Sequence, residues 1–186
     1  MSIFSEILER SKLNSELIGL WKYNDDDGFW CGSVIDYNDE IITIQHYTKF
    51  GKKDGIFIAQ SSDIESVDFN DDYAIAMRYL IENANELDNQ GTIDQIILEE
   101  DWQYEVLNQV SGSVEKIVSV EINGDSYYSG FVQRVTEVDF VMLCVGKMGE
   151  NEGLVLRKVA DITGFKINDL DNRKRLMLYN WRNANK

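Results

Sequence analysis

The chain has 186 residues, of which 44% are hydrophobic and 27% charged, and this composition is typical of one or two globular domains. Its 18 basic and 33 acidic side chains give a net charge of −15, which disfavours nucleic acids and anionic membranes as partners because both attract cations. No apolar run reaches the roughly 18 residues that span a bilayer, and residues 1–8 lack the basic start and apolar core of a signal peptide, so we expect a cytoplasmic protein.

The first half of the chain predicts a helix, five strands and a second helix, in that order. Apolar residues recur at helical spacing within residues 2–12, and the short β-branched or aromatic runs that follow are typical of strands. Asp71 and Asp72 precede the second helix, where two carboxylates suit the positive end of the helix dipole. The five strands are expected at residues 17–23, 29–37, 40–47, 56–59 and 64–69.

The second half of the chain predicts the same order of elements. Residues 85–92 are polar and form the expected linker, which precedes a helix at about residues 93–108. A last helix is expected at about residues 169–182. The five strands between these helices are expected at residues 116–122, 126–135, 138–145, 153–158 and 162–167.

An internal repeat explains why the two halves are alike. When the chain is shifted by 98 residues, ten positions between Gly28 and Leu80 are identical without a gap, against about three expected from ordinary residue frequencies. Two repeats are too few for a solenoid, so each unit must have its own core. Five short antiparallel strands close readily into a barrel. We therefore predict an α+β fold, mainly β with flanking helices, made of two tandem five-stranded barrels at residues 1–90 and 93–186.

The stretch from Gly32 to Ile44 resembles the first signature of the Sm-like proteins. In that signature a glycine in the second strand is followed by spaced apolar residues and an aromatic residue. Gly32, Val34 and Tyr37 fit this pattern. The resemblance implies that each unit is a helix followed by a strongly bent, SH3-like barrel of five strands.

The same resemblance bears on RNA binding. Ile42 in the first unit and Phe140 in the second stand where RNA-binding Sm proteins have a base-contacting asparagine. The second Sm signature, an Arg-Gly pair after the fourth strand, is represented by Ala59-Gln60 and Arg157-Lys158, of which only Arg157 fits. The missing polar residues and the acidic charge argue against a uridine-binding use of the fold.

The sequence offers no recognisable catalytic or metal site. His46 is the only histidine, and Cys31 and Cys144 lie in apolar runs typical of buried, reduced thiols. A catalytic Cys-His pair need only meet in space, but the repeat places Cys144 at the position of His46, which favours packing. The acidic turn at residues 25–27 contains one acid in the repeat, so a solvated turn is favoured over a calcium loop. We expect no enzymatic activity and no cofactor.

Aromatic strand residues and acidic turns favour a protein-binding role. Phe29-Trp30 and Tyr127-Tyr128 are adjacent pairs on strands, where side chains alternate between faces, and exposed aromatics suit protein contacts. Residues 1–92 carry 7 basic and 18 acidic side chains, which gives 7 − 18 = −11 and favours a basic partner. We expect a binding or scaffold protein, one version being an acidic inhibitor or immunity-type protein that shields a nuclease. The candidate partner-binding residues are Trp30, Tyr37, Tyr128, Asp25, Asp26 and Asp27.

The alternative function is that of an Sm-like RNA-binding module. It would use the basic residues of the second unit, which are Arg157, Lys158, Arg173, Lys174 and Arg175. Sm-like barrels often form rings by pairing the fourth strand of one barrel with the fifth strand of the next. Two barrels in one chain can satisfy one such contact internally, and the net charge of −15 opposes self-association, so we expect a monomer or a dimer.

Overall fold

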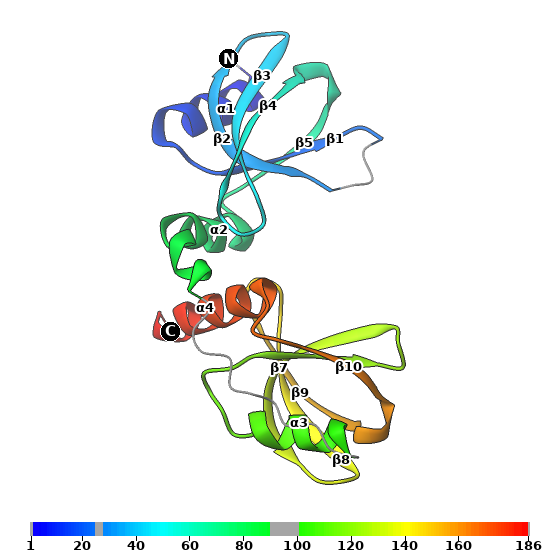
Figure 1. Cartoon of the computed structure of the whole chain (residues 1–186). Coiled ribbons are helices and arrows are strands. Elements are labelled where there is room, and N and C mark those ends of the chain that lie inside the picture. Colours follow the sequence, from blue (N-terminus) through cyan, green and yellow to red (C-terminus); the bar gives the residue numbers. More distant parts are fainter. Residues whose placement is uncertain (1, 25–27, 90–100, 186) are drawn as a thin grey trace. The chain divides into compact units, whose positions relative to one another are not determined.

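The computed structural model describes residues 2–24, 28–89 and 101–185 (Figure 1). The chain divides into two compact units, residues 1–84 and 85–186. Each unit contains a five-stranded antiparallel sheet, and four α-helices accompany the two sheets within the described residues. The predicted tandem duplication of an antiparallel β unit is confirmed, and the fold class is α+β.

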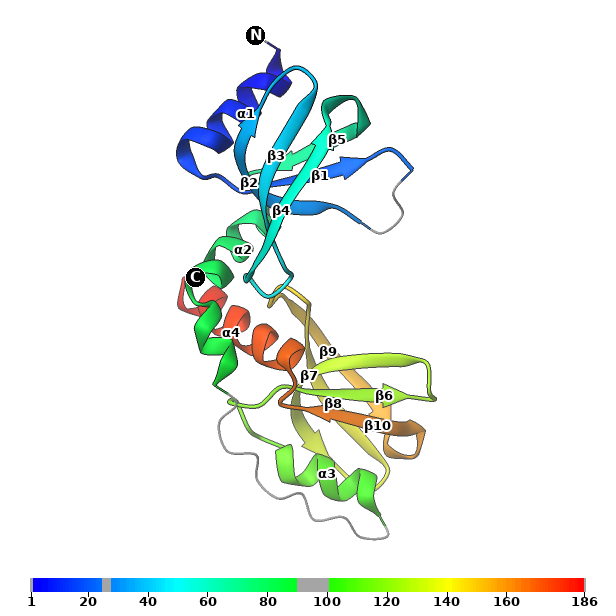
Figure 2. The ribbon, with the colours of Figure 1, turned by 45° about the horizontal axis from the view of Figure 1, so that its top comes forward.

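The first unit contains two helices, five strands and one short 3-10 helix. These elements are α1 (Ile3–Asn14), β1 (Ile18–Lys22), β2 (Trp30–Tyr37), β3 (Ile41–Tyr47), β4 (Lys53–Gln60), η1 (Ser61–Asp63), β5 (Ile64–Phe69) and α2 (Asp72–Glu82). The strand order is β4-β3-β2-β1-β5, so β4 and β5 are the edges of the sheet (Figure 2). Bulges interrupt the pairing of β3 with both of its neighbours, and bulges bend a sheet.

The second unit repeats this arrangement after a short 3-10 helix, η2 (Ala84–Asp88). Its elements are α3 (Trp102–Val110), β6 (Val118–Ile122), β7 (Ser126–Val135), β8 (Asp139–Val145), β9 (Asn151–Lys158), η3 (Val159–Asp161), β10 (Ile162–Ile167) and α4 (Leu170–Ala184). The strand order is β10-β6-β7-β8-β9. The edges are therefore β9 and β10, which correspond to β4 and β5 of the first unit.

The prediction that each sheet closes into a barrel is wrong. No pairing joins β4 to β5 or β9 to β10 within the described residues, so both sheets stay open. In the first unit, Phe4, Ile7 and Leu8 of α1 pack into the same core as the strand residues. The diameter of a barrel grows with its number of strands. Because the core of the first unit also holds side chains of α1, it is too wide for five strands alone to enclose.

Two helices, α2 and α4, each begin at a capping aspartate. The Asp71 side chain accepts a hydrogen bond of 2.7 Å from the backbone nitrogen of Ala74, and Asp169 accepts one of 2.8 Å from Asn172. Both carboxylates cap a helix N-terminus, which confirms the helix start expected at residues 71–72. Of the helix expected at about residues 93–108, the described part is α3; residues 93–100 lie outside the described residues. No helix of the described residues combines the length and the apolar character needed to cross a membrane.

Two pairs of repeated glycines are explained by close backbone contacts. A Cβ atom on Gly32 would overlap the carbonyl oxygen of Gln45 on β3, and a Cβ atom on Gly130 would overlap that of Leu143 on β8. Gly51 and Gly149 have positive φ angles of 75° and 80°, and a Cβ atom there would meet the backbone of α2 and α4, respectively, at 2.6 Å. The repeat therefore preserves positions where only glycine fits.

Candidate functional site

Trp30, the first candidate contact residue, packs toward the core of the first unit. Its ring stacks on Phe57 with a centroid distance of 4.1 Å and an interplanar angle of 11°. The His46 ring lies beside it in a T-shaped arrangement, with a centroid distance of 5.0 Å and an interplanar angle of 61°. Trp30 is half-buried and packs against the core cluster of Leu8, Ile42 and Ile44, so most of its ring is used inside the unit.

Tyr37 and Tyr128 are also half-buried. The Tyr37 hydroxyl donates a hydrogen bond of 3.0 Å to a Glu9 carboxylate oxygen on α1, and its ring packs on the core. Arg157 lies over the ring of Tyr128 at 4.3 Å from the centroid and donates a hydrogen bond to its hydroxyl. In the pair Tyr127-Tyr128 the exposed member is Tyr127, which was not a candidate. Asp25, Asp26 and Asp27 lie outside the described residues.

The basic residues of the RNA-binding alternative are mostly engaged within the second unit. Arg173 donates hydrogen bonds to the carbonyl oxygens of Leu87 and Asn168, and Arg175 donates one of 2.7 Å to that of Val145. Arg157 is engaged with Tyr128. Of the five candidates, Lys174 is buried and Lys158 is exposed.

The two positions that the resemblance relates to base contacts are core positions. Ile42 and Phe140 are buried, and each belongs to the main hydrophobic cluster of its unit. A buried side chain cannot reach a nucleotide unless the core opens. Both positions are therefore filled by packing.

The thiols and the histidine contribute to packing in the structure. Cys31 and Cys144 are buried and free. Burial raises the pKa of the Cys31 thiol to about 12, and the nearby Asp71 carboxylate adds to this effect. Burial is also the largest cause that raises the pKa of Cys144. Since thiolates rather than thiols are nucleophiles, neither cysteine has the electrostatic surroundings of a reactive residue.

Alkaline pH should destabilise the first unit through Cys31. The unfolded thiol ionises near its ordinary pKa of 9.0, whereas the folded thiol stays protonated up to about pH 12. Unfolding therefore releases a proton above pH 9, and the free energy of unfolding should fall by about 2–3 kcal/mol between pH 9 and pH 11. Urea unfolding at several pH values measures this slope. In Cys31→Ala the dependence of the free energy of unfolding on pH should decrease. The smaller dependence that remains is expected from Tyr73, because burial raises its pKa to about 12 as well. An unchanged dependence would contradict the assignment to Cys31.

Exposed aliphatic side chains lie on an edge strand of each unit. Ile56 and Ile58 on β4 are 62% and 63% exposed, and Leu154 and Leu156 on β9 are 70% and 64% exposed. The repeat makes these residues equivalent in pairs, because a shift of 98 residues places Ile56 on Leu154 and Ile58 on Leu156. An edge strand also presents unpaired backbone N–H and C=O groups, which can pair with another chain. Both units thus expose an apolar strip on an open edge.

In the first unit the strip on β4 leads to an acidic recess. Ile41 is the cross-strand partner of Gln60 at the end of β4, and it is 41% exposed. The Asn38 side chain accepts hydrogen bonds of 2.8 Å from the backbone nitrogens of Glu40 and Ile41, which fixes the turn beside the recess. The recess has a volume of about 320 Å³ and is lined by Asp39, Glu40, Ile41, Gln60 and Ser62.

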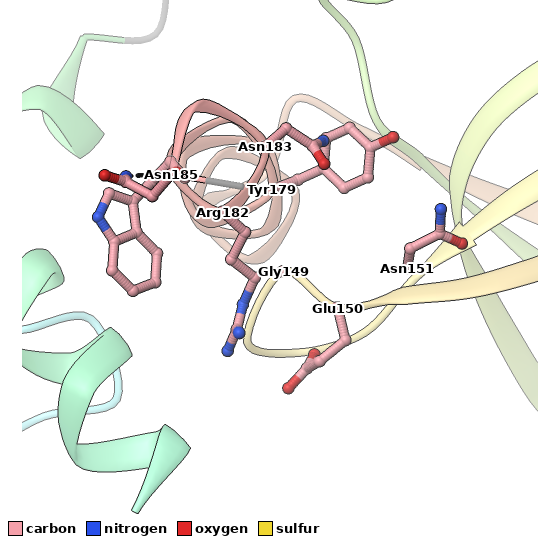
Figure 3. Close-up of a pocket in the computed structure, with 8 residues that line it drawn as sticks. Gly149, Glu150, Asn151, Tyr179, Arg182, Asn183 and Asn185 are labelled. Atoms are coloured by element: carbon pink, nitrogen blue, oxygen red, sulfur yellow. Dashed lines mark hydrogen bonds between the residues drawn. The ribbon is translucent and has the colours of Figure 1, made fainter.

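A second pocket, of about 410 Å³, lies in the second unit between the end of α4 and the loop before β9 (Figure 3). Arg182 donates a hydrogen bond of 2.7 Å to the Met148 carbonyl oxygen, and the Asn185 amide donates one of 2.7 Å to the Trp181 carbonyl oxygen. The lining is formed by Gly149, Glu150, Asn151, Tyr179, Trp181, Arg182, Asn183 and Asn185. These side chains offer amide and aromatic contacts but no cysteine, serine or histidine nucleophile.

Comparisons of the chain with protein-family models, with curated proteins and with solved structures found no match.

Proposed function

We propose that this protein is a non-catalytic, cytoplasmic binding protein whose first unit recognises an extended, basic segment of another protein. The segment adds to the free edge of β4 as a further strand. The observation that carries this proposal is the continuous surface formed by Ile56 and Ile58 on the edge strand and the acidic recess at the Gln60 end of that strand.

The edge of β4 supplies two kinds of contact for such a segment. Its backbone groups can form ladder hydrogen bonds, which give affinity without regard to sequence. Ile56 and Ile58 lie on one face, where alternate side chains of the added strand would meet them. The strand therefore favours a segment in which apolar residues alternate.

Charge adds a preference for the direction of the added strand. An antiparallel segment starts beside Gln60, so basic residues at its amino end reach Asp39 and Glu40. Residues 1–84 carry 7 basic and 16 acidic side chains, which gives 7 − 16 = −9 and attracts a basic partner over a longer range. An inhibitor that shields the phosphate-binding surface of a nuclease is one form of this function.

In this proposal, the resemblance to Sm-like proteins concerns the fold and not RNA binding. The free edges of each unit are the fourth and fifth strands, which are the strands that join Sm-like barrels. This agreement supports a common strand plan. The buried Ile42 and Phe140 and the engaged Arg173 and Arg175 support a function other than RNA binding.

A designed peptide tests the β4 surface directly. The probe has two lysines at its amino end, followed by alternating valine and threonine, and its affinity is measured by isothermal titration calorimetry. Ile56→Ser combined with Ile58→Ser should raise its dissociation constant by about tenfold or more, because two apolar contacts are lost. Asp39→Asn combined with Glu40→Gln should also weaken binding and reduce its dependence on salt.

The matched control is the equivalent pair on the second unit, Leu154→Ser combined with Leu156→Ser. The β9 strand ends at Arg157 and Lys158, which disfavour the lysine end of the probe, so this variant should bind it like the unmodified protein. A peptide with its lysines at the carboxyl end should bind more weakly than the probe. Equal loss of affinity in both double variants would contradict the assignment to β4.

A further inference from the structure

We propose that β9 is a self-complementary edge through which two copies of this chain form an antiparallel, two-fold symmetric dimer. This dimer site is distinct from the β4 surface and does not depend on the proposed recognition of a basic segment. It concerns the second unit only, and it uses the exposed side chains and the charges of one strand.

The apolar part of the site is the exposed face of β9. Leu154 and Leu156 point to the same face of the strand and are 70% and 64% exposed. Their neighbours across the sheet are Leu143 and Val141 on β8, which are half-buried. A second strand laid beside β9 would cover both leucines and extend this apolar face.

The charges at the two ends of β9 make the strand complementary to itself. Glu152 lies near its start and Lys158 at its end, and both are exposed. An antiparallel pairing centred on Val155 places Leu154 opposite Leu156 of the second copy, and Glu152 opposite its Lys158. Two-fold symmetry repeats each of these contacts, so the dimer has two leucine pairs flanked by two ion pairs.

A bulge sets a limit on the backbone pairing at the acidic end. It lies on β9 itself: Cys144 of β8 pairs with Gly153 and Val145 pairs with Asn151, so Glu152 is the extra residue of the bulge. Glu152 would therefore meet Lys158 through the ends of two long side chains, and regular ladder pairing would extend over residues 154–156 of both copies. Such a short edge gives a weak dimer, so the test uses charge variants that act on both ion pairs at once.

The two equivalent pairings that involve β4 offer fewer ion pairs. An antiparallel pairing of β4 with itself, centred on Phe57, places Asp54 opposite Gln60 and forms none. Pairing β4 with β9 of a second copy places Asp54 opposite Lys158 but Gln60 opposite Glu152, which gives one ion pair. The first unit also carries a net charge of −9, whereas residues 85–186 carry 11 basic and 17 acidic side chains, or −6. The second unit, which has the smaller net charge and so repels a second copy less, thus also has the edge strand that is more complementary to itself.

Sedimentation equilibrium of the full chain at physiological salt tests the dimer. The unmodified protein should dimerise reversibly. Glu152→Lys alone and Lys158→Glu alone should each raise the dimer dissociation constant by about tenfold or more, because each reversal turns both ion pairs into like-charge contacts. The double variant E152K/K158E exchanges the two charges and should dimerise like the unmodified protein.

Mixing the two single variants gives the sharpest outcome. Each is expected to be monomeric alone, but an equimolar mixture should form a heterodimer. In that heterodimer the lysine introduced at position 152 of one chain faces the glutamate introduced at position 158 of the other, and the unchanged Lys158 faces the unchanged Glu152, so both ion pairs are restored. Lys166→Glu on β10, the other edge of this sheet, is the matched control and should dimerise normally. Circular dichroism confirms that every variant is folded.

Three results would overturn the proposal. These are a monomer at every concentration of the unmodified protein, a dimer that neither single reversal weakens, and a failure of the mixed variants to pair. A dimer lost in Lys166→Glu would instead assign the contact to β10. Titration of the lysine peptide against the same variants should show unchanged affinity, so failure of the dimer and failure of the β4 proposal are separate results.

Discussion

Replacing Gly130 with alanine should lower the free energy of unfolding of the second unit by about 3 kcal/mol. The added Cβ atom would overlap the Leu143 carbonyl oxygen on the neighbouring strand, and this is backbone that cannot rotate away. Relief requires β7 and β8 to separate, which strains the ladder between them, and overpacking of this kind costs about 1–3 kcal/mol or more. Urea unfolding, followed by hydrogen exchange of the β7 and β8 amides, measures the loss.

Gly153→Ala is the matched control for this prediction. Gly153 has a positive φ of 86°, but nothing lies within 4 Å of a Cβ atom built there. Its replacement should therefore cost about 1 kcal/mol, from backbone strain alone. Equal losses in Gly130→Ala and Gly153→Ala would show that conformational freedom, rather than the close approach of β8, explains the repeated glycine.

Phe140→Ala should destabilise the second unit by about 3–5 kcal/mol. Phe140 is 1% exposed and packs in the cluster that contains Val120 and Met142, so truncation removes buried apolar area and leaves a cavity. Val138→Ala is the control, because Val138 is 69% exposed and its truncation should change the free energy of unfolding by less than about 0.5 kcal/mol. Thermal and urea unfolding of both variants provide the comparison.

The Phe140 result also bears on function. If Phe140 contacted a ligand at the place where RNA-binding Sm proteins contact a base, its truncation would reduce binding and leave the fold largely intact. The structure predicts the opposite outcome for this residue. A stable, well-folded Phe140→Ala variant would contradict the description of this position as core.

The repeat was the most informative feature of the sequence. The repeated glycines and helix-capping residues lie where the backbone geometry accepts few residue types. Examples are Gly51 beside α2 and Asp71 at the start of that helix. Alternating apolar residues between these markers predicted the strands, and the structure contains five in each unit. Local patterns of this kind depend on neighbouring residues and can therefore be read from one sequence.

Barrel closure and exposure of the aromatics could not be predicted in this way. Both depend on residues far apart in the chain. The core of the first unit is widened by Leu8 of α1, and Trp30 is covered by Phe57 of β4. The apolar run 56–58 is by itself compatible with either a strand buried on both faces or an edge strand. Only the strand order distinguishes these, because it places β4 at the edge with Ile56 and Ile58 exposed.

Amide chemical shifts of the labelled protein, recorded during titration with the lysine peptide, test the central claim most directly. We predict that the perturbed amides cluster on β4, on the adjacent β3 and around Asp39 and Glu40, because an added strand forms hydrogen bonds with the β4 edge and fills the acidic recess. Perturbations confined to β5, to α2 or to the second unit, or no perturbation at saturating peptide, would contradict it.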